Sequence, residues 1–244
     1  MEIQRNWHAE YEGRVEWIRE LVQSSGAKGI IFGNSGGKDS ALVGILCKAA
    51  CENTVGIIMP CASRRNYEID AKDGRELAEQ YGIETRIVDL TAVREQELLA
   101  IQGVTTMTDL AISNIAPRLR MTTLYAIGQA EGRLVAGTGN RSEAYMGYYT
   151  KWGDGAHDFN PISDLTATEI FAFLEYLKAP RSIIDKAPSA GLFDGQTDED
   201  EMGVTYRAID TFLMTGEASD QDLAVIERYH SRSEHKRRPI ATYR

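Results

Sequence analysis

The sequence predicts an α/β fold in which a parallel, twisted sheet is flanked by helices on both faces. Four short apolar runs, typical of buried strands, alternate along the chain with longer segments of helical periodicity. Strands that alternate with helices form right-handed parallel crossovers, and these build a doubly wound sheet. The length of 244 residues suits one such domain, and we expect residues 1–244 to form it.

The elements of the first half can be justified in order. An opening helix carries one apolar stripe, formed by Trp7, Tyr11, Val15, Ile18 and Val22. The predicted strands are residues 29–33, 54–60, 83–90 and 133–137. The predicted helices between them are residues 40–50, 66–82, 92–101 and 108–129. Gly82 suits a helix end because glycine adopts positive φ readily, and Pro117 predicts a kink or a restart.

The region after the fourth strand is less regular. Residues 137–164 are polar and contain five glycines, and long irregular segments in compact domains are usually functional or mobile. A helix at 166–177 starts with a capping box formed by Thr166 and Glu169. Two more helices are expected at 205–213 and 220–230, followed by a basic tail at 233–240.

The loop after the first strand, in the stretch IFGNSGGKDS (residues 31–40), indicates phosphate chemistry. A Walker A loop would need glycine at position 32 and Ser or Thr at 39, but the chain has Phe32 and Asp39. A glycine turn that opens a helix still favours an anion, because free N–H groups and the helix dipole point at it. Asp39 fits this place if Mg²⁺ lies between the carboxylate and the phosphate. A simple turn capped by Asp39 or Ser40 is the alternative, and the complete S-G-G-x-D-S string favours the nucleotide site.

Composition excludes several classes of protein. The formal net charge of −9, from 36 acidic and 27 basic residues, argues against binding to nucleic acid without regard to its base sequence. The charged N-terminus lacks the apolar core of a signal peptide, and no run reaches the ~18 apolar residues of a membrane span. Cys47, Cys51 and Cys61 form neither an even disulfide framework nor a C-x-x-C motif. We therefore expect a cytoplasmic protein with no membrane and no nucleic-acid partner.

Other polar clusters leave alternatives open. Ligands of doubly wound sheets bind at the carboxyl ends of the strands, so the loops after the first and fourth strands share one rim. Glu143 is then either a second metal ligand facing Asp39 or a surface carboxylate at the start of a helix. The acidic run at 194–201 lacks the EF-hand pattern and reads as a solvated loop. The basic run at 235–238 is either a solvated tail or, with Arg118, Lys151 and Lys186, part of a site for an anionic ligand.

These motifs carry a family resemblance over nearly the whole chain. The S-G-G-x-D-S loop resembles that of the ATP pyrophosphatases, which have a Rossmann-like fold and cleave ATP between the α and β phosphates. More narrowly, the chain resembles the ammonia-dependent NAD synthetases. The segments that match, in the family's order, are GNSGGKDSALV, NIAPRLRM, GTGNRSE, GYYTKWGDGAHDFNPISDLT, KAPSAGLFDGQTDEDEMG and EHKRRP. The first motif is shared by several ATP pyrophosphatases, whereas the combination of the other five is highly specific.

The resemblance implies a reaction and a set of site residues. The carboxylate of deamido-NAD would attack the α-phosphorus of ATP, and ammonia would displace AMP from the acyl-adenylate. Asp39 and Glu143 would hold Mg²⁺, and Lys186 would neutralise phosphate charge during catalysis. The ATP-binding positions would be Gly33, Asn34, Ser35, Gly36, Gly37, Lys38, Asp39, Ser40, Thr138 and Ser189. The positions that contact deamido-NAD would be Arg118, Lys151, Asp158, His235 and Lys236.

The resemblance also implies a homodimer with substrate near the subunit interface. The chain has no room for the glutaminase domain of some relatives, so ammonia would come from solution or from a separate glutaminase. Two departures are notable: Ala167 stands where many members carry an ATP-contacting lysine, and Ser189 stands where bacterial members often have threonine. Ala167 leaves open a paralogue that activates a different carboxylic acid.

Two other classes of function are considered. An RNA-modifying ATP pyrophosphatase would bind tRNA, which the acidic balance disfavours. A non-catalytic ATP sensor would tolerate loss of Asp39, whereas an enzyme would not.

Overall fold

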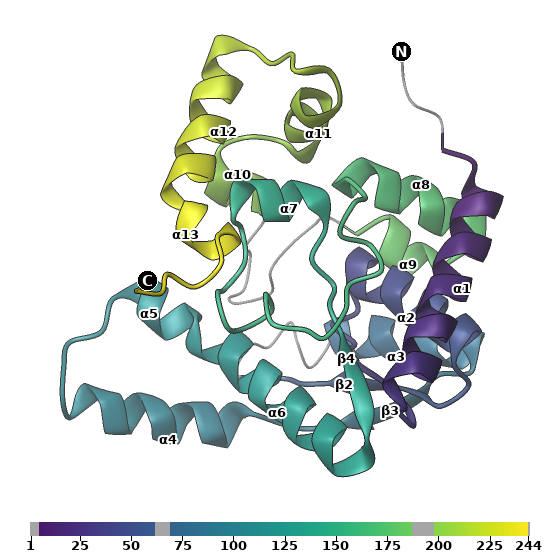
Figure 1. The fold of residues 1–244 in the computed structure, drawn as a ribbon. Helices are drawn as coiled ribbons and strands as arrows, with labels where there is room; N and C mark the ends of the chain where they lie inside the picture. Colours follow the sequence, from purple (N-terminus) through teal and green to yellow (C-terminus); the bar gives the residue numbers. More distant parts are fainter. Residues whose placement is uncertain (1–4, 62–68, 187–197, 244) are drawn as a thin grey trace.

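One parallel sheet forms the centre of the protein. The computed structural model describes residues 5–61, 69–186 and 198–243 (Figure 1). Within these ranges the strands are β1 (Gly29–Gly33), β2 (Thr54–Ile58), β3 (Glu84–Ile87) and β4 (Arg133–Ala136). Their order is β3-β2-β1-β4, and every pair is parallel. The chain therefore winds outward from β1 in both directions, which confirms the predicted doubly wound fold.

One face of the sheet is covered by α1 (Trp7–Ser25), α2 (Lys38–Ala50), α3 (Ala71–Tyr81) and α8 (Ala167–Leu177). Because successive side chains of a strand point to opposite faces, Ile30 and Phe32 of β1 belong to this core and Ile31 to the other. Helix α2 lies between the sheet and α1, and Ala41 to Cys47 are all buried. This burial fixes the helix that starts at the phosphate loop.

The other face is covered mainly by α6 (Ile115–Glu131). Helices α4 (Thr91–Gln102) and α5 (Asp109–Ser113) precede it and contain no buried residue. The predicted single helix at 108–129 is thus two helices, separated at Asn114 rather than at Pro117. Pro117 is the third residue of α6, where its missing N–H is harmless because the first turn of a helix has no intrahelical acceptors for such groups.

The C-terminal half adds a helical layer with its own apolar cluster. Its elements are α7 (Arg141–Met146), α10 (Asp198–Met202), α11 (Tyr206–Thr215), α12 (Asp220–Arg232) and α13 (Glu234–Arg237). The short helix α9 (Arg181–Ile184) instead packs against α2 and α8, and its Ile183 belongs to the core on their face of the sheet. The predicted basic tail therefore begins with a short helix, and residues 239–243 extend from it (Figure 1). None of the helices in the described ranges is both long and apolar enough to cross a membrane.

The irregular segment between α7 and α8 returns to the sheet. Phe159 forms a parallel bridge with Ala136 beside β4. The Gly137 N–H donates to the Phe159 carbonyl at 2.8 Å, and the Asp158 N–H donates to the Val135 carbonyl at 2.9 Å. The segment is therefore hydrogen-bonded to the end of β4, where one of the two predicted site loops begins.

Candidate active site

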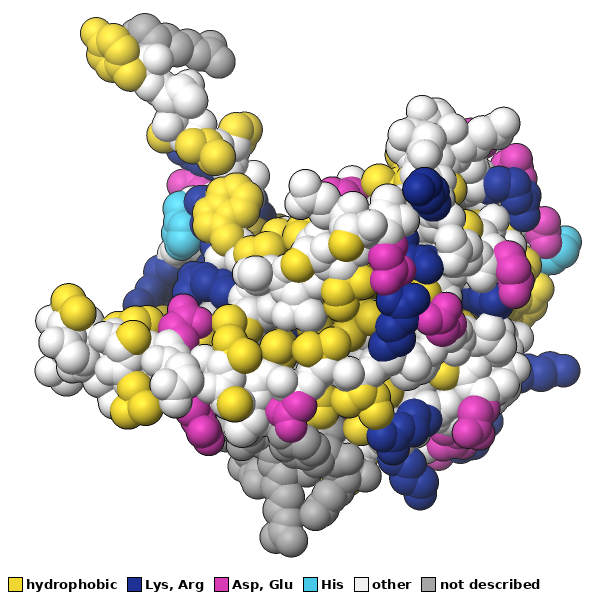
Figure 2. All heavy atoms as spheres, turned by 90° about the horizontal axis from the view of Figure 1, so that it is seen from below, with side chains coloured by type: hydrophobic (Ala, Val, Ile, Leu, Met, Phe, Trp, Pro, Cys, Tyr) yellow, Lys and Arg dark blue, Asp and Glu magenta, His cyan; other side chains and the backbone are white. Residues whose placement is uncertain are grey.

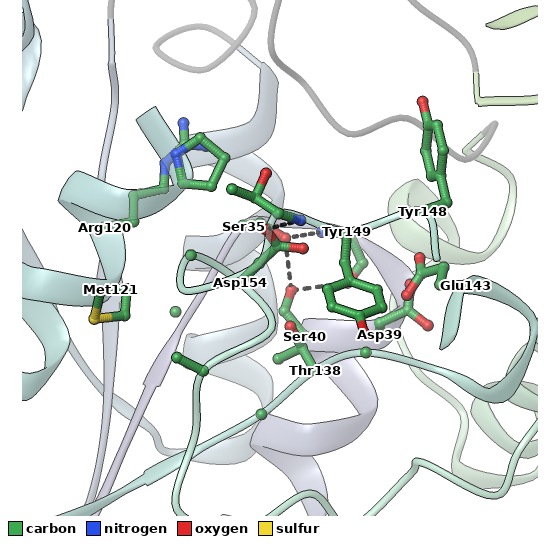
Figure 3. Close-up of a pocket in the computed structure, with 18 of the residues that line it drawn as sticks. Ser35, Asp39, Ser40, Arg120, Met121, Thr138, Glu143, Tyr148, Tyr149 and Asp154 are labelled. Atoms are coloured by element: carbon green, nitrogen blue, oxygen red, sulfur yellow. Dashed lines mark hydrogen bonds between the residues drawn. The ribbon is translucent and has the colours of Figure 1, made fainter. Parts of the chain in front are cut away.

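A large cavity opens at the carboxyl ends of the strands. Its volume is about 950 Å³, and its lining comes from the loops after β1 and β4 and from α6, α7, α12 and α13. The two glycine-bearing loops that the sequence placed on one rim both line it, as predicted. The cavity also extends beyond these loops to residues of α6 and α13, and Figure 3 shows a part of its lining.

The phosphate loop connects β1 to α2 through a turn that requires glycine. Gly36 has φ of 69°, and a Cβ at this residue would lie 2.3 Å from the Asp70 carbonyl oxygen. Gly37 is the N-cap of α2 and provides no side-chain cap. The start of α2 therefore faces the cavity without a competing side-chain acceptor, as an anion site requires.

Three side chains stabilise the shape of this loop. Asn34 is almost fully buried; its Nδ2 donates to the Gly74 carbonyl at 2.8 Å, and its Oδ1 accepts from the Gly36 N–H. The hydroxyls of Ser35 and Ser40 lie 3.0 Å apart across the turn (Figure 3). Asn34 thus anchors the loop to α3 through its side-chain amide. Its contact with ATP stays a prediction.

Asp39 and Glu143 reach the cavity from the first turns of α2 and α7 and lie side by side (Figure 3). Glu143 is the third residue of α7, where it forms a capping box with Asn140. The other end of the Asn140 side chain donates from Nδ2 to Asp39 Oδ1 at 3.0 Å. The buried Asn140 side chain therefore connects the starts of α2 and α7, a role that the sequence interpretation did not identify.

The two carboxylates fit a hard divalent cation. Burial and the neighbouring Asp39 raise the pKa of Glu143 well above its usual range, and Lys38 opposes this shift. A bound cation would relieve the repulsion between the two groups. Among the described residues no set of three or more His, Cys, Asp or Glu side chains forms a complete metal cage. Mg²⁺ suits such a site, because it commonly takes one or two carboxylates and completes its shell with water and phosphate oxygens.

Lys186 lies beside the phosphate loop in the described structure. Its Nζ donates to Asp70 Oδ1 and Asp73 Oδ2, both at 2.7 Å, and is 3.4 Å from the Gly36 carbonyl oxygen. All three side chains are largely buried. The predicted lysine is therefore near the phosphates' expected place, and the two aspartates that hold it there were not found from the sequence.

The basic residues meet at the opposite end of the cavity. Lys151 Nζ donates to the His235 carbonyl at 2.7 Å, and Arg118 Nη2 donates to the Lys151 carbonyl at 3.4 Å. Lys236 Nζ donates to the carbonyls of Gly147 and Tyr149. Burial lowers the pKa of Lys236, and the nearby Arg118 acts in the same direction. Arg118, Lys151, His235 and Lys236 all line the cavity, although they come from three distant parts of the chain.

One predicted residue, Asp158, lies outside the cavity lining, and another, Ser189, is not described. Asp158 is not among the lining residues; its Oδ2 accepts from the Val135 N–H at 2.8 Å and its Oδ1 from the Tyr125 hydroxyl at 3.1 Å. Its contact with substrate stays a prediction. Ser189 lies outside the described residues.

Several lining residues were missed by the sequence interpretation. Tyr148 and Tyr149 line the cavity near α7, and Asp154 and Arg120 lie deeper toward α6 (Figure 3). Asp154 accepts from the Thr150 N–H at 3.0 Å, and Arg120 donates to the Met59 carbonyl at 3.2 Å. The glycines around Asp154 marked a loop with candidate function, but nothing in the local spacing indicated which side chains point inward.

Comparisons with known proteins agree on one family. The family model described as NAD synthase matches residues 10–240. The NH(3)-dependent NAD(+) synthetase of Carboxydothermus hydrogenoformans is 46% identical over 236 residues, which cover 96% of each chain.

Two solved structures are also similar. The NMN synthetase of Francisella tularensis has a TM-score of 0.93 and 38% identity, with 98% of this chain and 99% of that chain covered. The NH3-dependent NAD synthetase of Campylobacter jejuni, solved with nitrate, has a TM-score of 0.80 and 29% identity, with 99% of this chain and 100% of that chain covered.

Proposed function

The chain belongs to the NAD synthase family, and from this membership we propose that it converts deamido-NAD, ATP and ammonia to NAD, AMP and pyrophosphate. It is then a ligase that forms a carbon–nitrogen bond. The observation that carries the proposal is one cavity with a glycine-rich phosphate loop and two carboxylates at one end and four basic residues at the other. Such a cavity suits a nucleoside triphosphate that meets a second polyanionic substrate.

The first step joins the two substrates. A carboxylate oxygen of deamido-NAD attacks the α-phosphorus of ATP, and the bond between that phosphorus and the bridging oxygen of pyrophosphate breaks. The start of α2 and Lys186 bind the departing pyrophosphate, whose negative charge they stabilise. Asp39 and Glu143 would hold Mg²⁺, which supplies charge neutralisation to the phosphates when bound.

The second step releases AMP. Ammonia attacks the carbonyl carbon of the acyl-adenylate, the bond from that carbon to the adenylate oxygen breaks, and a proton is lost to solvent. Arg118, Lys151, His235 and Lys236 position the dinucleotide so that its acid group faces the phosphate loop. Ammonia comes from solution or from a separate glutaminase. We place the reaction in the cytoplasm, where the unpaired state of Cys47, Cys51 and Cys61 is normal.

The assay is an incubation of the protein with Mg·ATP, ammonium and deamido-NAD, with NAD, AMP and pyrophosphate measured together. Equal yields of the three products are expected. AMP and pyrophosphate without NAD would indicate an adenylate that is hydrolysed instead of amidated. A folded protein that binds ATP but yields none of these products would contradict the proposal.

A mononucleotide acid is a second candidate substrate. The relative with TM-score 0.93 is an NMN synthetase, whereas the NAD synthetase structure scores 0.80. Ala167, which replaces a lysine common in the family, is fully buried at the start of α8. The discriminating measurement is kcat/KM for deamido-NAD against kcat/KM for the acid that yields NMN on amidation. A ratio well above one supports the dinucleotide, and a ratio well below one supports the mononucleotide.

We also propose that two copies of the chain associate through the face formed by α4, α5 and α6. Leu99 is 62% exposed, Leu110 is 70% exposed and Val104 is 87% exposed. Figure 2 views this face and shows hydrophobic side chains spread across it. Isolated exposed apolar residues are ordinary, but a face on which one helix has no buried residue and several large apolar side chains are exposed suits a protein partner. Leu110, Pro117 and Arg118 of this region also line the cavity, so a second copy would adjoin the substrate.

Sedimentation equilibrium tests this association. The wild type should sediment as a dimer, and Leu99→Glu should sediment as a monomer because a charge would be buried at the interface. Tyr176→Glu, on α8 at the opposite face, is the matched control and should leave the dimer intact. A monomeric wild type at assay concentrations would contradict the proposed dimer without bearing on the reaction.

A further inference from the structure

The side chain of Lys38, a residue of the phosphate loop, contacts the proposed metal ligand Asp39. Lys38 is the first residue of α2 and is only 6% exposed. Its Nζ donates to Asp39 Oδ2 at 2.5 Å. The same Nζ lies 5.4 Å from the ring centre of Tyr206 and 5.8 Å from that of Phe171, within the range of cation–π attraction. These contacts hold the ammonium beside Asp39, and the contact of Lys38 with ATP stays a prediction.

The neighbours of this ammonium are mostly negative. Asp39 accepts its hydrogen bond, and Glu143 and Asp198 attract it electrostatically. Asp198 is buried and accepts from the Tyr206 hydroxyl at 3.0 Å. The tyrosine whose ring lies near Lys38 therefore also holds the third carboxylate. One buried ammonium thus lies among three carboxylates, two of which are the assigned Mg²⁺ ligands.

We propose that Lys38 is a positioning residue, a resident counter-ion that makes divalent-cation binding at Asp39 and Glu143 depend on bound nucleotide. The inference rests on the proposed function only in taking these two carboxylates as the metal ligands. Without metal, the ammonium compensates the repulsion between the carboxylates and orients Asp39 together with Asn140. With metal alone, the same ammonium repels the cation. ATP adds phosphate charge and ligand oxygens, and these overcome the repulsion.

The test measures Mn²⁺ binding by electron paramagnetic resonance, with Mn²⁺ as the probe and α,β-methylene-ATP as a nucleotide that is not cleaved. Mildly alkaline buffer limits proton competition for the carboxylates. The wild type should bind Mn²⁺ weakly alone and much more tightly with the analogue. Lys38→Met should bind Mn²⁺ alone about tenfold more tightly than the wild type, because one nearby positive charge is gone. The gain that the analogue produces should shrink correspondingly.

Lys38→Arg is the matched control because it keeps the charge, and its affinity for Mn²⁺ alone should stay close to that of the wild type. Asp39→Asn should abolish the binding and so identify the site. The proposal is overturned if folded Lys38→Met binds Mn²⁺ alone no more tightly than the wild type, or if Lys38→Arg tightens binding equally. If Lys38→Met fails to fold, the wild type alone still tests the proposal. Equal Mn²⁺ affinity of the wild type with and without the analogue would refute it.

The failure of the inference and the failure of the proposed function give different results. Unchanged Mn²⁺ affinity in Lys38→Met, from a preparation whose wild type makes NAD, removes only the role of Lys38. No Mn²⁺ binding in any variant, even with the analogue, removes the metal site on which the reaction depends and the inference with it.

Discussion

The two ends of the cavity are built in opposite ways. The phosphate end is built around one short segment, residues 33–40, on a strand and a helix whose core residues are buried, and Glu143 and Lys186 join it from other elements. The acid end is assembled from α6, the 147–155 segment and α13, and its basic side chains are held by hydrogen bonds to backbone carbonyls. The loop at the first end is a property of local sequence, whereas the second end depends on the tertiary structure throughout. Substitutions should therefore have distinct kinetic signatures at the two ends.

The largest effect is expected at the phosphate end, for Asp39→Asn. This change alters the carboxylate that accepts from Asn140 and that we propose as a metal ligand, so kcat/KM should fall at least about 100-fold, as when one preorganised electrostatic group is lost. Coupled detection of AMP and pyrophosphate measures it. Asp220→Asn, on the exposed start of α12, is the control and should retain wild-type activity. Full activity in Asp39→Asn would end the assignment of the loop to catalysis.

Lys186→Met should lower kcat about 100-fold and should also reduce stability. Removing the ammonium leaves Asp70 and Asp73 close together in a largely buried place, which costs about 3 kcal/mol of unfolding free energy. Steady-state kinetics and urea denaturation together separate the two effects. Lys72→Met, exposed on the same helix as Asp73, should alter neither quantity. A stability loss with unchanged kcat would make Lys186 purely structural.

At the acid end, Lys236→Met should raise KM for the acid about tenfold and leave KM for ATP nearly unchanged. Because the folded-state pKa of Lys236 is lowered, its ammonium loses its proton at a lower pH than an exposed lysine. In the wild type, KM for the acid should therefore rise as pH increases through that lowered pKa. Lys236→Met should lack this rise, and Lys236→Arg should move it to higher pH. An equal change in KM for ATP would mean that the two ends are not separable.

The smallest effect is expected for Asp158→Asn. The Asp158 carboxylate accepts from Val135 and Tyr125, so its loss should cost about 1 kcal/mol of unfolding free energy. KM for the acid should change less than about threefold, since Asp158 connects the segment between α7 and α8 to β4 and α6 and does not line the cavity. Thermal denaturation and KM determination give both numbers. A rise in KM comparable to that of Lys236→Met would place Asp158 at the substrate, as the family resemblance implies.

The comparison also explains what the sequence could predict. The strand–loop–helix at Gly33–Ser40 followed from glycine spacing and from apolar runs, because those properties act locally. Arg118, Lys151 and Lys236 were assigned from the family motifs, and their meeting in one cavity depends on contacts that α6 and α13 make with the 147–155 segment, which no spacing reveals. Asn140, Asp70 and Asp73 were missed for the same reason, since each acts on a residue distant in sequence. The break between the two helices was predicted at Pro117 but lies at Asn114, because proline is harmless in a first helical turn.

The bridge between Ala136 and Phe159 has a consequence for folding. It ties the segment that carries Lys151 to the central sheet through amides at Gly137 and Asp158. Opening that segment must break hydrogen bonds to β4, so its cooperative unit of unfolding includes the sheet. In native-state hydrogen exchange, the amides of Gly137 and Asp158 should exchange at the same slow rate as those of β4. The acid end of the site should therefore persist until the whole domain unfolds.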